Sequence, residues 1–427
     1  MLDIKFIREN LELCKEAAKN KNRIVDWDAL LALDEKRREL IGKSEVVRAK
    51  RNTVKGDGKD PAVREEGKRL KEELKTIEDE LRIVEDQFQM AMYTVPNVPD
   101  KSVPIGKDES ENVVIKEWPA RNASRSEAGG GEPTKFDFPI RDHIDLAKSL
   151  DLIDLDRGAK VGGSRAYFLK NEAAQMEFAV LFYTFQKLIG KGYTPLIAPS
   201  LVREFTLFGN GQFPWGREEV YHLEKDDEYL AGTAEVPVTA YFSDEVLQEK
   251  DLPKKFVAFS PCFRREAGSY GKDTRGVYRL HQFSKIEQVV ISTNDMNNSI
   301  TLHNELLQNA EEVLQDLELP YRVLLMCTGD MGEPQVKKYD IETWMPGRSA
   351  YGETMSNSIM GDFQARRLKI RYKAKDGLTH FCHTLNNTAI ASPRILIAIL
   401  ENYQQKDGSI KIPKVLQPLI GKSEIRR

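Results

Sequence analysis

The fold of this chain is decided by the stretch FRREAGSYGKDTRGVYRLHQFSKIE, which occupies residues 263–287. Its pattern predicts two strands joined by a polar loop, with Arg264 and Arg279 projecting from the two sides of that loop. Guanidinium groups make bidentate contacts with phosphate oxygens, so two of them beside one loop suit a nucleotide triphosphate. A surface hairpin with solvated charges gives the same pattern, and the surrounding segments have to decide between the two.

The body around this hairpin runs from about residue 136 to the C-terminus and mixes helical with strand-like stretches in no regular alternation. It has neither of the patterns G-x-G-x-x-G and G-x-x-x-x-G-K-S/T, and the three glycines at 129–131 precede no Lys-Ser/Thr pair. Those patterns carry the Rossmann and Walker nucleotide sites. The body is therefore predicted to be α+β, with a mostly antiparallel sheet.

A separate helical arm is predicted for residues 27–93, where apolar side chains recur every seven residues in two runs. The first run is Leu33, Leu40, Val47 and Val54, and the second is Val63, Leu70, Ile77 and Val84 with the companion series Leu74, Leu81 and Phe88. Between them lies GDGKDP at 56–61, where glycines end one helix and Pro61 can open the next. Heptads on both sides of a turn predict an antiparallel coiled-coil hairpin.

Charge is uneven along this arm. Residues 43–69 contain nine basic and five acidic side chains, whereas residues 70–86 contain three basic and seven acidic ones. A rod with a basic tip suits contact with a phosphate backbone. Charge alone, however, favours a solvated coiled coil that binds another protein or dimerises.

The composition of the 427 residues is that of a charge-rich globular protein, with 31% charged residues and a mean hydropathy of −0.50. The net charge of −3 excludes an overall basic nucleic-acid-binding protein but allows a local basic patch. No apolar run reaches the ~18 residues of a spanning helix and no secretory signal is visible, so we expect a cytoplasmic chain with no membrane partner. The four cysteines form no C-x-x-C pair, and His380 and His383 have no evident third ligand, so no zinc site is expected.

Several further segments stand in a fixed order around the hairpin. They are GYTPLIAP at 192–199, Thr233-Ala234-Glu235, the segment 353–356, and Asn386-Asn387-Thr388 followed by Ser392-Pro393-Arg394. With RREAGS at 264–269, DTRG at 273–276 and HQF at 281–283, they resemble the bacterial type of seryl-tRNA synthetases, a class II aminoacyl-tRNA synthetase family. The three class II motifs match around Pro199, around residues 263–266 and around Arg394.

This resemblance covers essentially the whole chain, including the arm and the connector PNVP at 96–99. It implies an N-terminal tRNA-binding domain at 1–110 with a coiled-coil arm at about 27–93, a linker at 111–135, and a class II catalytic domain at 136–427. It also implies a homodimer, because motif 1 forms the class II interface. The activity implied is a serine–tRNA ligase, which forms seryl-adenylate from L-serine and ATP and then charges tRNA(Ser), and tRNA(Sec) where one exists.

The resemblance also implies roles in an ATP site. Arg264 would bridge the α-phosphate and the serine carboxylate, Arg279 would hold the outer phosphates, and Phe283 and Arg394 would cover the two faces of adenine. Arg264 and Arg394 are the expected catalytic residues. The expected ATP-binding set is Arg264, Arg265, Glu266, Arg279, Phe283, Glu353, Thr354, Met355, Ser356 and Arg394.

Within that set, the oxygens of Glu353 and Ser356 are the expected Mg²⁺ ligands, as a hard cation requires. Met355 stands where the family usually has a serine, and the segment 357–360 is less polar than usual, which leaves the local shape of this loop open. The glycines of the segment 208–214 would suit a lid over the serine site.

The serine site implied by the resemblance is a small polar pocket with two carboxylates. Thr233 and Glu235 would hold the α-ammonium, Glu287 the ammonium or the hydroxyl, and Thr388 the hydroxyl. The expected serine-binding set is Thr233, Ala234, Glu235, Arg264, Glu287, Asn386 and Thr388.

The resemblance changes the interpretation of the arm, because in this family the arm clasps the long variable arm of the tRNA. The expected tRNA-binding side chains are Lys43, Arg48, Lys50, Arg51, Lys55, Arg64, Lys68 and Arg69. Two alternatives remain at this stage. One is a class II paralogue that loads an amino acid onto a carrier protein, although such relatives usually lack the arm. The other is a non-catalytic RNA-binding descendant, which would be expected to lose Arg264, Glu353 or Arg394.

Overall fold

The structure is a computed structural model that describes residues 1–54, 61–119, 136–268 and 275–427. Within these ranges the chain forms two compact units, Met1–Pro96 and Asn97–Arg427.

The first unit contains four helices in its described residues, namely α1 (Ile4–Glu9), α2 (Leu11–Asn20), α3 (Trp27–Thr53) and α4 (Pro61–Tyr93). Helix α3 begins at the Asp26 N-cap, whose carboxylate accepts a hydrogen bond from the backbone N–H of Ala29 at 3.0 Å. Ile7, Leu30 and Met92 are buried in a small core that joins α1 to the bases of α3 and α4.

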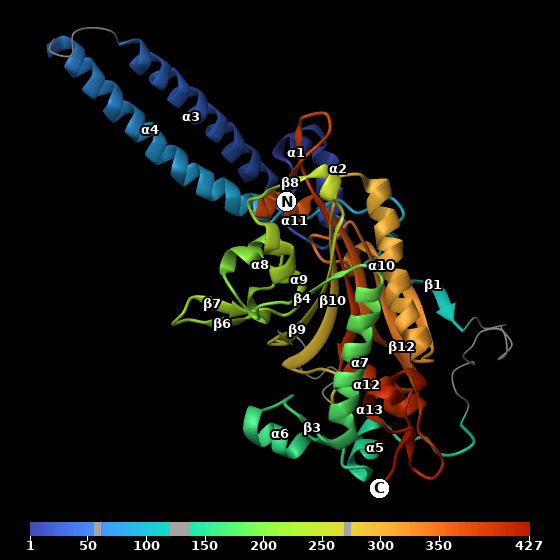
Figure 1. The fold of residues 1–427 in the computed structure, drawn as a ribbon. Coiled ribbons are helices and arrows are strands. Elements are labelled where there is room, and N and C mark those ends of the chain that lie inside the picture. Colours follow the sequence, from blue (N-terminus) through green and yellow to red (C-terminus); the bar gives the residue numbers. More distant parts are fainter. Residues whose placement is uncertain (55–60, 120–135, 269–274) are drawn as a thin grey trace. The chain divides into compact units, whose positions relative to one another are not determined.

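The helices α3 and α4 pack against each other as the predicted hairpin, which confirms the coiled-coil arm (Figure 1). The apolar residues of the predicted seam are buried or half-buried along both helices, and Val47, Leu70 and Leu74 form its distal core. Ser44 is buried in the same seam, where its hydroxyl donates to the Ile41 carbonyl at 2.8 Å. At ~1.5 Å per residue, the 27 residues of α3 span ~40 Å.

The second unit is built on an eight-stranded sheet, counted over the described residues, in the order β1-β11-β12-β13-β16-β10-β9-β4. Its strands are β1 (Val113–Trp118), β4 (Thr194–Ile197), β9 (Lys254–Phe263), β10 (Gln282–Ser292), β11 (Tyr321–Leu325), β12 (Lys337–Met345), β13 (Ala350–Gly361) and β16 (His383–Ser392). All neighbours are antiparallel except β4 and β9. The predicted α+β class with an antiparallel sheet is therefore confirmed.

One face of this sheet is covered by helices α7 (Asn171–Gly190), α10 (Met296–Asp316) and α12 (Arg394–Asn402), as Figure 1 shows. Side chains alternate along each strand, so Ile286 and Val290 of β10 enter the core under these helices, whereas Lys285 and Glu287 lie on the opposite face. Both of those charged residues are almost fully buried. Lys285 and Glu287 thus place two charges on the face of the sheet that α7, α10 and α12 do not cover.

Shorter elements complete the second unit. The helices are α5 (His143–Ser149), α6 (Leu155–Gly162), α8 (Glu204–Asn210), α9 (Glu235–Thr239), α11 (Phe363–Leu368) and α13 (Gln417–Ile420). The small sheets are β5 (Leu201–Val202) with β7 (Glu228–Leu230) and β6 (Tyr221–Leu223), β15 (Thr379–Phe381) with β14 (Arg371–Lys373) and β8 (Val246–Gln248), β2 (Ile153–Asp154) with β3 (Phe168–Leu169), and β17 (Ile410–Lys411) with β18 (Glu424–Ile425). Of these, α9 packs on β10, and α11 packs on β13, β16 and α8.

The boundaries of the second unit differ from the predicted ones. The Asn97 side chain donates to the carbonyls of Pro334 and Met360 at 2.9 and 2.8 Å, so residues 97–110, which were predicted to belong to the N-terminal domain, lie in the second unit. Val113–Trp118, which was predicted to be linker, pairs with β11 at the edge of the sheet. The rest of the predicted linker, residues 120–135, lies outside the described residues.

Candidate active site

The hairpin predicted at residues 263–287 forms. Strands β9 and β10 pair antiparallel, with Phe263 opposite Gln282. The pairing continues past the strand ends, because the N–H of Arg264 donates to the His281 carbonyl at 2.9 Å and the His281 Nδ1 lies 3.0 Å from the Arg264 carbonyl. Residues 269–274 of the loop lie outside the described residues.

The Arg264 side chain lies between two groups of predicted site residues. Its Nε donates to the Gly232 carbonyl at 3.2 Å, directly before the segment 233–235. Its guanidinium carbon lies 5.2 Å from the ring centroid of Phe283 on β10, and its charge acts on the Glu353 carboxylate of β13. One exposed guanidinium therefore lies close to both the predicted serine-binding residues and the predicted ATP-binding residues.

Arg394 lies in the first turn of α12 and, like Arg264, interacts with Glu353. Its Nε donates to the Tyr278 carbonyl at 2.9 Å, and its guanidinium carbon lies 4.3 Å from the Tyr278 ring centroid. Its Nη1 donates to the Glu353 carbonyl at 2.8 Å and lies 3.4 Å from the Glu353 carboxylate. Burial acts to raise the pKa of Glu353, but the charges of Arg394, Lys338 and Arg264 outweigh it and hold that pKa below its ordinary value. Glu353 is therefore an anion at neutral pH.

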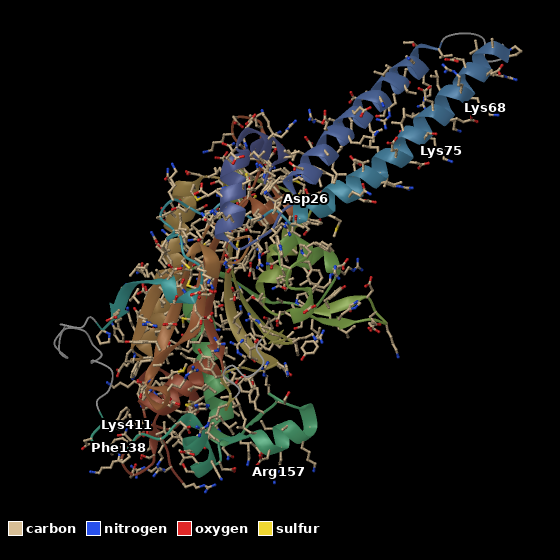
Figure 2. The ribbon with its side chains drawn as sticks, turned by 180° about the vertical axis from the view of Figure 1, so that it is seen from behind. Asp26, Lys68, Lys75, Phe138, Arg157 and Lys411 are labelled. Carbon is tan, nitrogen blue, oxygen red and sulfur yellow. The ribbon has the colours of Figure 1, made fainter. Side chains whose placement is uncertain are left out.

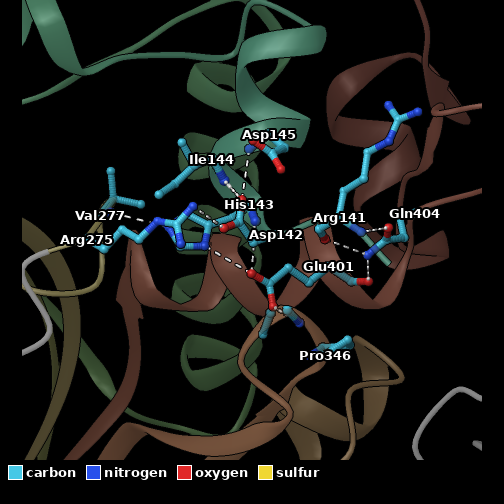
Figure 3. Close-up of polar contacts among 12 residues, drawn as sticks. Arg141, Asp142, His143, Ile144, Asp145, Arg275, Val277, Pro346, Glu401 and Gln404 are labelled. Atoms are coloured by element: carbon cyan, nitrogen blue, oxygen red, sulfur yellow. Dashed lines mark hydrogen bonds and ion pairs between the residues drawn. The ribbon is translucent and has the colours of Figure 1, made fainter. Parts of the chain in front are cut away.

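Next to Val277 at the end of the hairpin loop lies a buried histidine–glutamate pair that was not predicted from the sequence (Figure 3). His143 Nδ1 is 3.0 Å from Glu401 Oε1, and the backbone N–H of Val277 points at His143 Nε2 at 3.5 Å. The second oxygen of Glu401 accepts from the Gly347 N–H at 2.8 Å. The pair therefore ties α5, α12 and the turn at 346–348 to the end of the hairpin loop.

The residues predicted to bind the substrate serine converge on a buried lysine. Lys285 Nζ donates to the hydroxyls of Thr233 at 2.7 Å and Thr388 at 3.3 Å, and it forms an ion pair with Glu287. The Thr388 hydroxyl donates to Glu287 at 3.3 Å. Lys285 and Glu287 are 4% and 2% exposed, so each is the main compensation for the charge of the other. Lys285 was not predicted to be a site residue, although its spacing of two from Glu287 on a strand places both on one face.

Glu235 begins α9, and its N–H donates to the Thr233 hydroxyl at 3.2 Å. Burial and the neighbouring Glu287 carboxylate together raise the pKa of Glu235. Asn386, two residues from Thr388 on β16, is 4% exposed, and its side-chain nitrogen has no hydrogen-bond partner among the described residues. Ala234 is fully buried in the apolar cluster beneath the site, so its side chain contributes packing.

Two residues of the predicted ATP set have side chains on the other side of the sheet. Thr354 bonds the Thr343 hydroxyl at 2.7 Å, and Met355, 1% exposed, packs in the core under the helices. The reason is a β-bulge in the pairing of β12 with β13, which puts Glu353 opposite Glu342 and Ser356 opposite Asp340. Glu353 and Ser356 therefore share a face despite their spacing of three.

The remaining predicted ATP residues lie at the edge of the hairpin. Arg279 Nη1 forms an ion pair with Glu266 Oε2 at 2.6 Å, and Arg265, next to Glu266 in the sequence, is exposed.

The segment 208–214, which was predicted to be a lid, is anchored, since the Arg367 guanidinium donates to the carbonyls of Phe208 at 2.8 Å and Phe213 at 3.0 Å.

The histidines considered as metal ligands have separate partners. His383 Nδ1 is 2.9 Å from the Ser299 hydroxyl, and His380 lies 3.7 Å from Asp376. Across the described parts of the chain, no three His, Cys, Asp or Glu side chains are grouped to hold a metal. In those same parts, no helix has both the length and the apolar character needed to cross a bilayer.

Residues 220–403 match the family model of the tRNA synthetase class II core domain (G, H, P, S and T), and residues 1–99 match that of the seryl-tRNA synthetase N-terminal domain. The serine–tRNA ligase of Deinococcus radiodurans is 44% identical over all of this chain and 99% of its own length. The chain belongs to the seryl-tRNA synthetase family. The serine–tRNA ligase of Dictyoglomus thermophilum, 45% identical over the same shares, agrees.

Solved seryl-tRNA synthetases have the same fold over the full length. That of Pyrococcus horikoshii, complexed with ATP, is 39% identical with a TM-score of 0.89, covering all of this chain and 99% of its own. That of Naegleria fowleri, in complex with AMP, is 31% identical with a TM-score of 0.86 and the same coverage. The predicted family, fold class and serine–tRNA ligase activity are confirmed.

Proposed function

We propose that this seryl-tRNA synthetase binds L-serine and ATP on the two sides of Arg264 and joins them there as seryl-adenylate. This proposal rests on the position of the Arg264 guanidinium. It donates a hydrogen bond to the Gly232 carbonyl beside the proposed serine-binding residues and acts electrostatically on Glu353 beside the proposed ATP-binding residues. An arginine at that point can contact the serine carboxylate and the α-phosphate together. It would stabilise the negative charge that builds up as these two groups react.

The first chemical step needs no general base. The serine carboxylate is already ionised at neutral pH, and its oxygen would attack the α-phosphorus while the bond to the bridging oxygen breaks and pyrophosphate leaves. In the second step the 3′-terminal hydroxyl of the tRNA would attack the carbonyl carbon of the adenylate, and AMP would leave. The contribution of the side chains is positioning and charge neutralisation.

Serine selection would rest on the buried network around Lys285. Thr233 and Glu235 would hold the α-ammonium, while Glu287 and Thr388 would bond the hydroxyl, with Asn386 supplying its unbonded amide nitrogen. When the substrate enters, these groups lose their hydrogen bonds to water, and alanine has no hydroxyl to replace them. Leaving one such buried group without a partner costs about 1–3 kcal/mol, which sets the scale of discrimination.

ATP would lie along the edge of the hairpin. Phe283 and the Arg394 guanidinium can sandwich the adenine ring, an arrangement that combines stacking with a cation–π contact. Arg279, with Arg265 beside it, would hold the outer phosphates after exchanging its ion pair with Glu266 for phosphate oxygens. Glu266 would then be released towards adenine or the tRNA terminus. Thr354 and Met355 would support this site from the core, since their side chains lie under the sheet.

The residues on this face fit Mg²⁺, which would bind with ATP. Glu353 and Ser356 supply hard oxygen ligands, and Asp340, which lies opposite Ser356, has one buried carboxylate oxygen with no hydrogen-bond partner among the described residues. Burial raises the pKa of Asp340, and a cation would offset that penalty. When bound, Mg²⁺ neutralises phosphate charge. No residue set for zinc is proposed.

The coiled-coil arm would bind tRNA(Ser), and tRNA(Sec) where present, through its basic tip. Lys50, Arg51, Arg64 and Lys68 are exposed on α3 and α4, and Lys68 is labelled in Figure 2. Lys43, Arg48 and Arg69 are held in ion pairs with Glu39, Glu78 and Glu66, which would be exchanged for phosphates on binding. Lys55 lies outside the described residues.

A homodimer in the cytoplasm completes the proposal. The apolar side chains of Phe178 and Phe182 on α7 are 77% and 52% exposed, and Ile197 on the adjacent β4 is 83% exposed. An apolar face of this kind beside motif 1 would be covered by a second copy of the chain. The four cysteines are buried and unpaired, which suits a reducing compartment.

The test is ATP–pyrophosphate exchange with serine, threonine, alanine and glycine, followed by transfer to tRNA(Ser). We expect exchange with serine and charging of the tRNA. Exchange without transfer to any tRNA would favour the carrier-protein paralogue. A chain that exchanges with none of the four amino acids would be a binding module.

A further inference from the structure

Gln364 is a fully buried residue on α11 that no class II motif contains, yet it contacts the serine site directly. Its Nε2 donates to Glu235 Oε1 at 2.8 Å and to the Asn210 carbonyl at 2.9 Å. Its Oε1 accepts from the Thr384 hydroxyl of β16 at 2.6 Å. One amide thus joins α9, the end of α8 and the central sheet.

The orientation of this amide follows from its partners. A backbone carbonyl can only accept a hydrogen bond, so the nitrogen of Gln364 has to face Asn210. The same nitrogen then faces Glu235, and the oxygen faces Thr384, whose hydroxyl can donate. With both ends of the amide engaged, the donor directed at Glu235 has one available orientation.

We propose that Gln364 is a positioning residue for serine activation, which holds the Glu235 carboxylate in the orientation that receives the α-ammonium. This inference rests on the proposed role of Glu235. Glu235 is only partly buried, and one of its oxygens is occupied by Gln364. This hydrogen bond fixes the direction of the carboxylate beside the serine site.

The charge state of Glu235 depends on the groups that face it. Burial and the Glu287 carboxylate raise its pKa, whereas the Gln364 amide, the Lys285 ammonium and the Asn210 side chain lower it. The α-ammonium of serine needs the ionised carboxylate. Removing the amide donor would therefore raise the pKa of Glu235 further, so that serine binding begins to fail at a higher pH than in the wild type.

A second contact shows that α11 is the fixed support of this side of the site. One turn along from Gln364, Arg367 donates to the carbonyls of Phe208 and Phe213. Gln364 bonds the carbonyl of Asn210 within the same segment. Glu235 is thus tied to a segment that is itself anchored, which limits the positions its carboxylate can take.

The experiment compares Gln364→Met with the wild-type enzyme in ATP–pyrophosphate exchange from pH 5 to 8. Methionine keeps the volume of the side chain and removes both donor and acceptor. We expect KM for serine to rise about 10- to 100-fold and the acidic limb of kcat/KM for serine to move up by about half a pH unit or more. KM for ATP should stay within about twofold of the wild-type value. The matched control is Gln315→Met on α10, which removes a hydrogen bond of 2.8 Å to Tyr321 in the core behind the sheet and should change neither quantity.

A wild-type KM for serine with an unmoved acidic limb in Gln364→Met would overturn the inference while leaving the proposed function intact. If the wild-type enzyme itself shows no serine-dependent exchange, the proposed function fails first. Should Gln364→Met not fold, Thr384→Val decides. That variant removes only the hydroxyl that orients the amide, and it should shift the acidic limb in the same direction by a smaller amount. A Thr384→Val enzyme with the wild-type pH profile would overturn the inference.

Discussion

Replacing Lys285 by methionine would remove a buried cation from the serine site while keeping most of the aliphatic stem. The change deletes the hydrogen bonds to Thr233 at 2.7 Å and Thr388 at 3.3 Å and the ion pair with Glu287. Glu287, at 2% exposure, would be left as a carboxylate without its cation. The variant therefore tests whether this network is both a source of stability and the substrate site.

The expected magnitude follows from the burial of the pair. Removing one partner of a buried ion pair costs about 3–5 kcal/mol. The unit Asn97–Arg427 has about 330 residues, and an unfolding entropy of about 2.1 cal/mol/K per residue gives about 0.7 kcal/mol/K for it. The melting temperature of this unit should fall by about 4–7 °C. The surface pair of Lys422 with Glu172 supplies the matched control, since Lys422→Met should cost at most about 1 kcal/mol.

Calorimetry and ATP–pyrophosphate exchange separate the two roles of Lys285. In the double variant Lys285→Met/Glu287→Gln the unpaired charge is gone, so most of the melting temperature should return while serine-dependent exchange stays lost. The reasoning is refuted if Lys285→Met melts within about 1 °C of the wild-type enzyme and retains its KM for serine.

Three further outcomes are expected. Arg264→Ala should lower serine-dependent exchange by at least about 100-fold with little change in melting temperature, because the guanidinium is exposed and acts on the reacting groups; near-normal exchange would contradict the bridging role. Deleting residues 36–83 and joining residues 35 and 84, which lie near the point where Lys36 of α3 pairs with Glu80 of α4 at 3.0 Å, should preserve exchange and abolish charging of tRNA(Ser). Intact charging would show that the arm does not read the tRNA. Finally, kcat/KM for tRNA should fall as salt rises whereas exchange changes little, and a flat salt response would argue against phosphate contacts at the tip.

The parts of the fold that local patterns control could be predicted from the sequence. The heptad positions of α3 and α4, including Val47, Leu70 and Leu74, pack where the seven-residue spacing puts them, because a helix fixes which side chains share a face. The hairpin of β9 and β10 is likewise a local structure. Strand β1 was missed because its apolar residues Val113, Val114 and Ile115 form a run without the alternation of a half-buried strand, and they are exposed at the edge of the sheet.

The candidate site was predictable in part. Resemblance brought together residues far apart in sequence, and the geometry gathers Arg264, Glu353 and Arg394 as expected. The resemblance could not indicate that a β-bulge sends the side chains of Thr354 and Met355 to the other face of the sheet. One extra residue in a strand reverses the alternation of side chains between the two faces without changing the composition.

By itself, the sequence determined that this chain has a coiled-coil arm, an antiparallel α+β body and the residues of a seryl-tRNA synthetase, because periodicity and motif order are properties of the chain alone. Only the tertiary structure decided which side chains hold the functional groups in place. The contacts of Lys285 with Thr233, of Gln364 with Glu235 and of His143 with Glu401 join residues 52, 129 and 258 positions apart, and such contacts exist only once the chain has folded. A buried polar group needs a partner wherever the fold supplies one, and no local pattern records where that partner is.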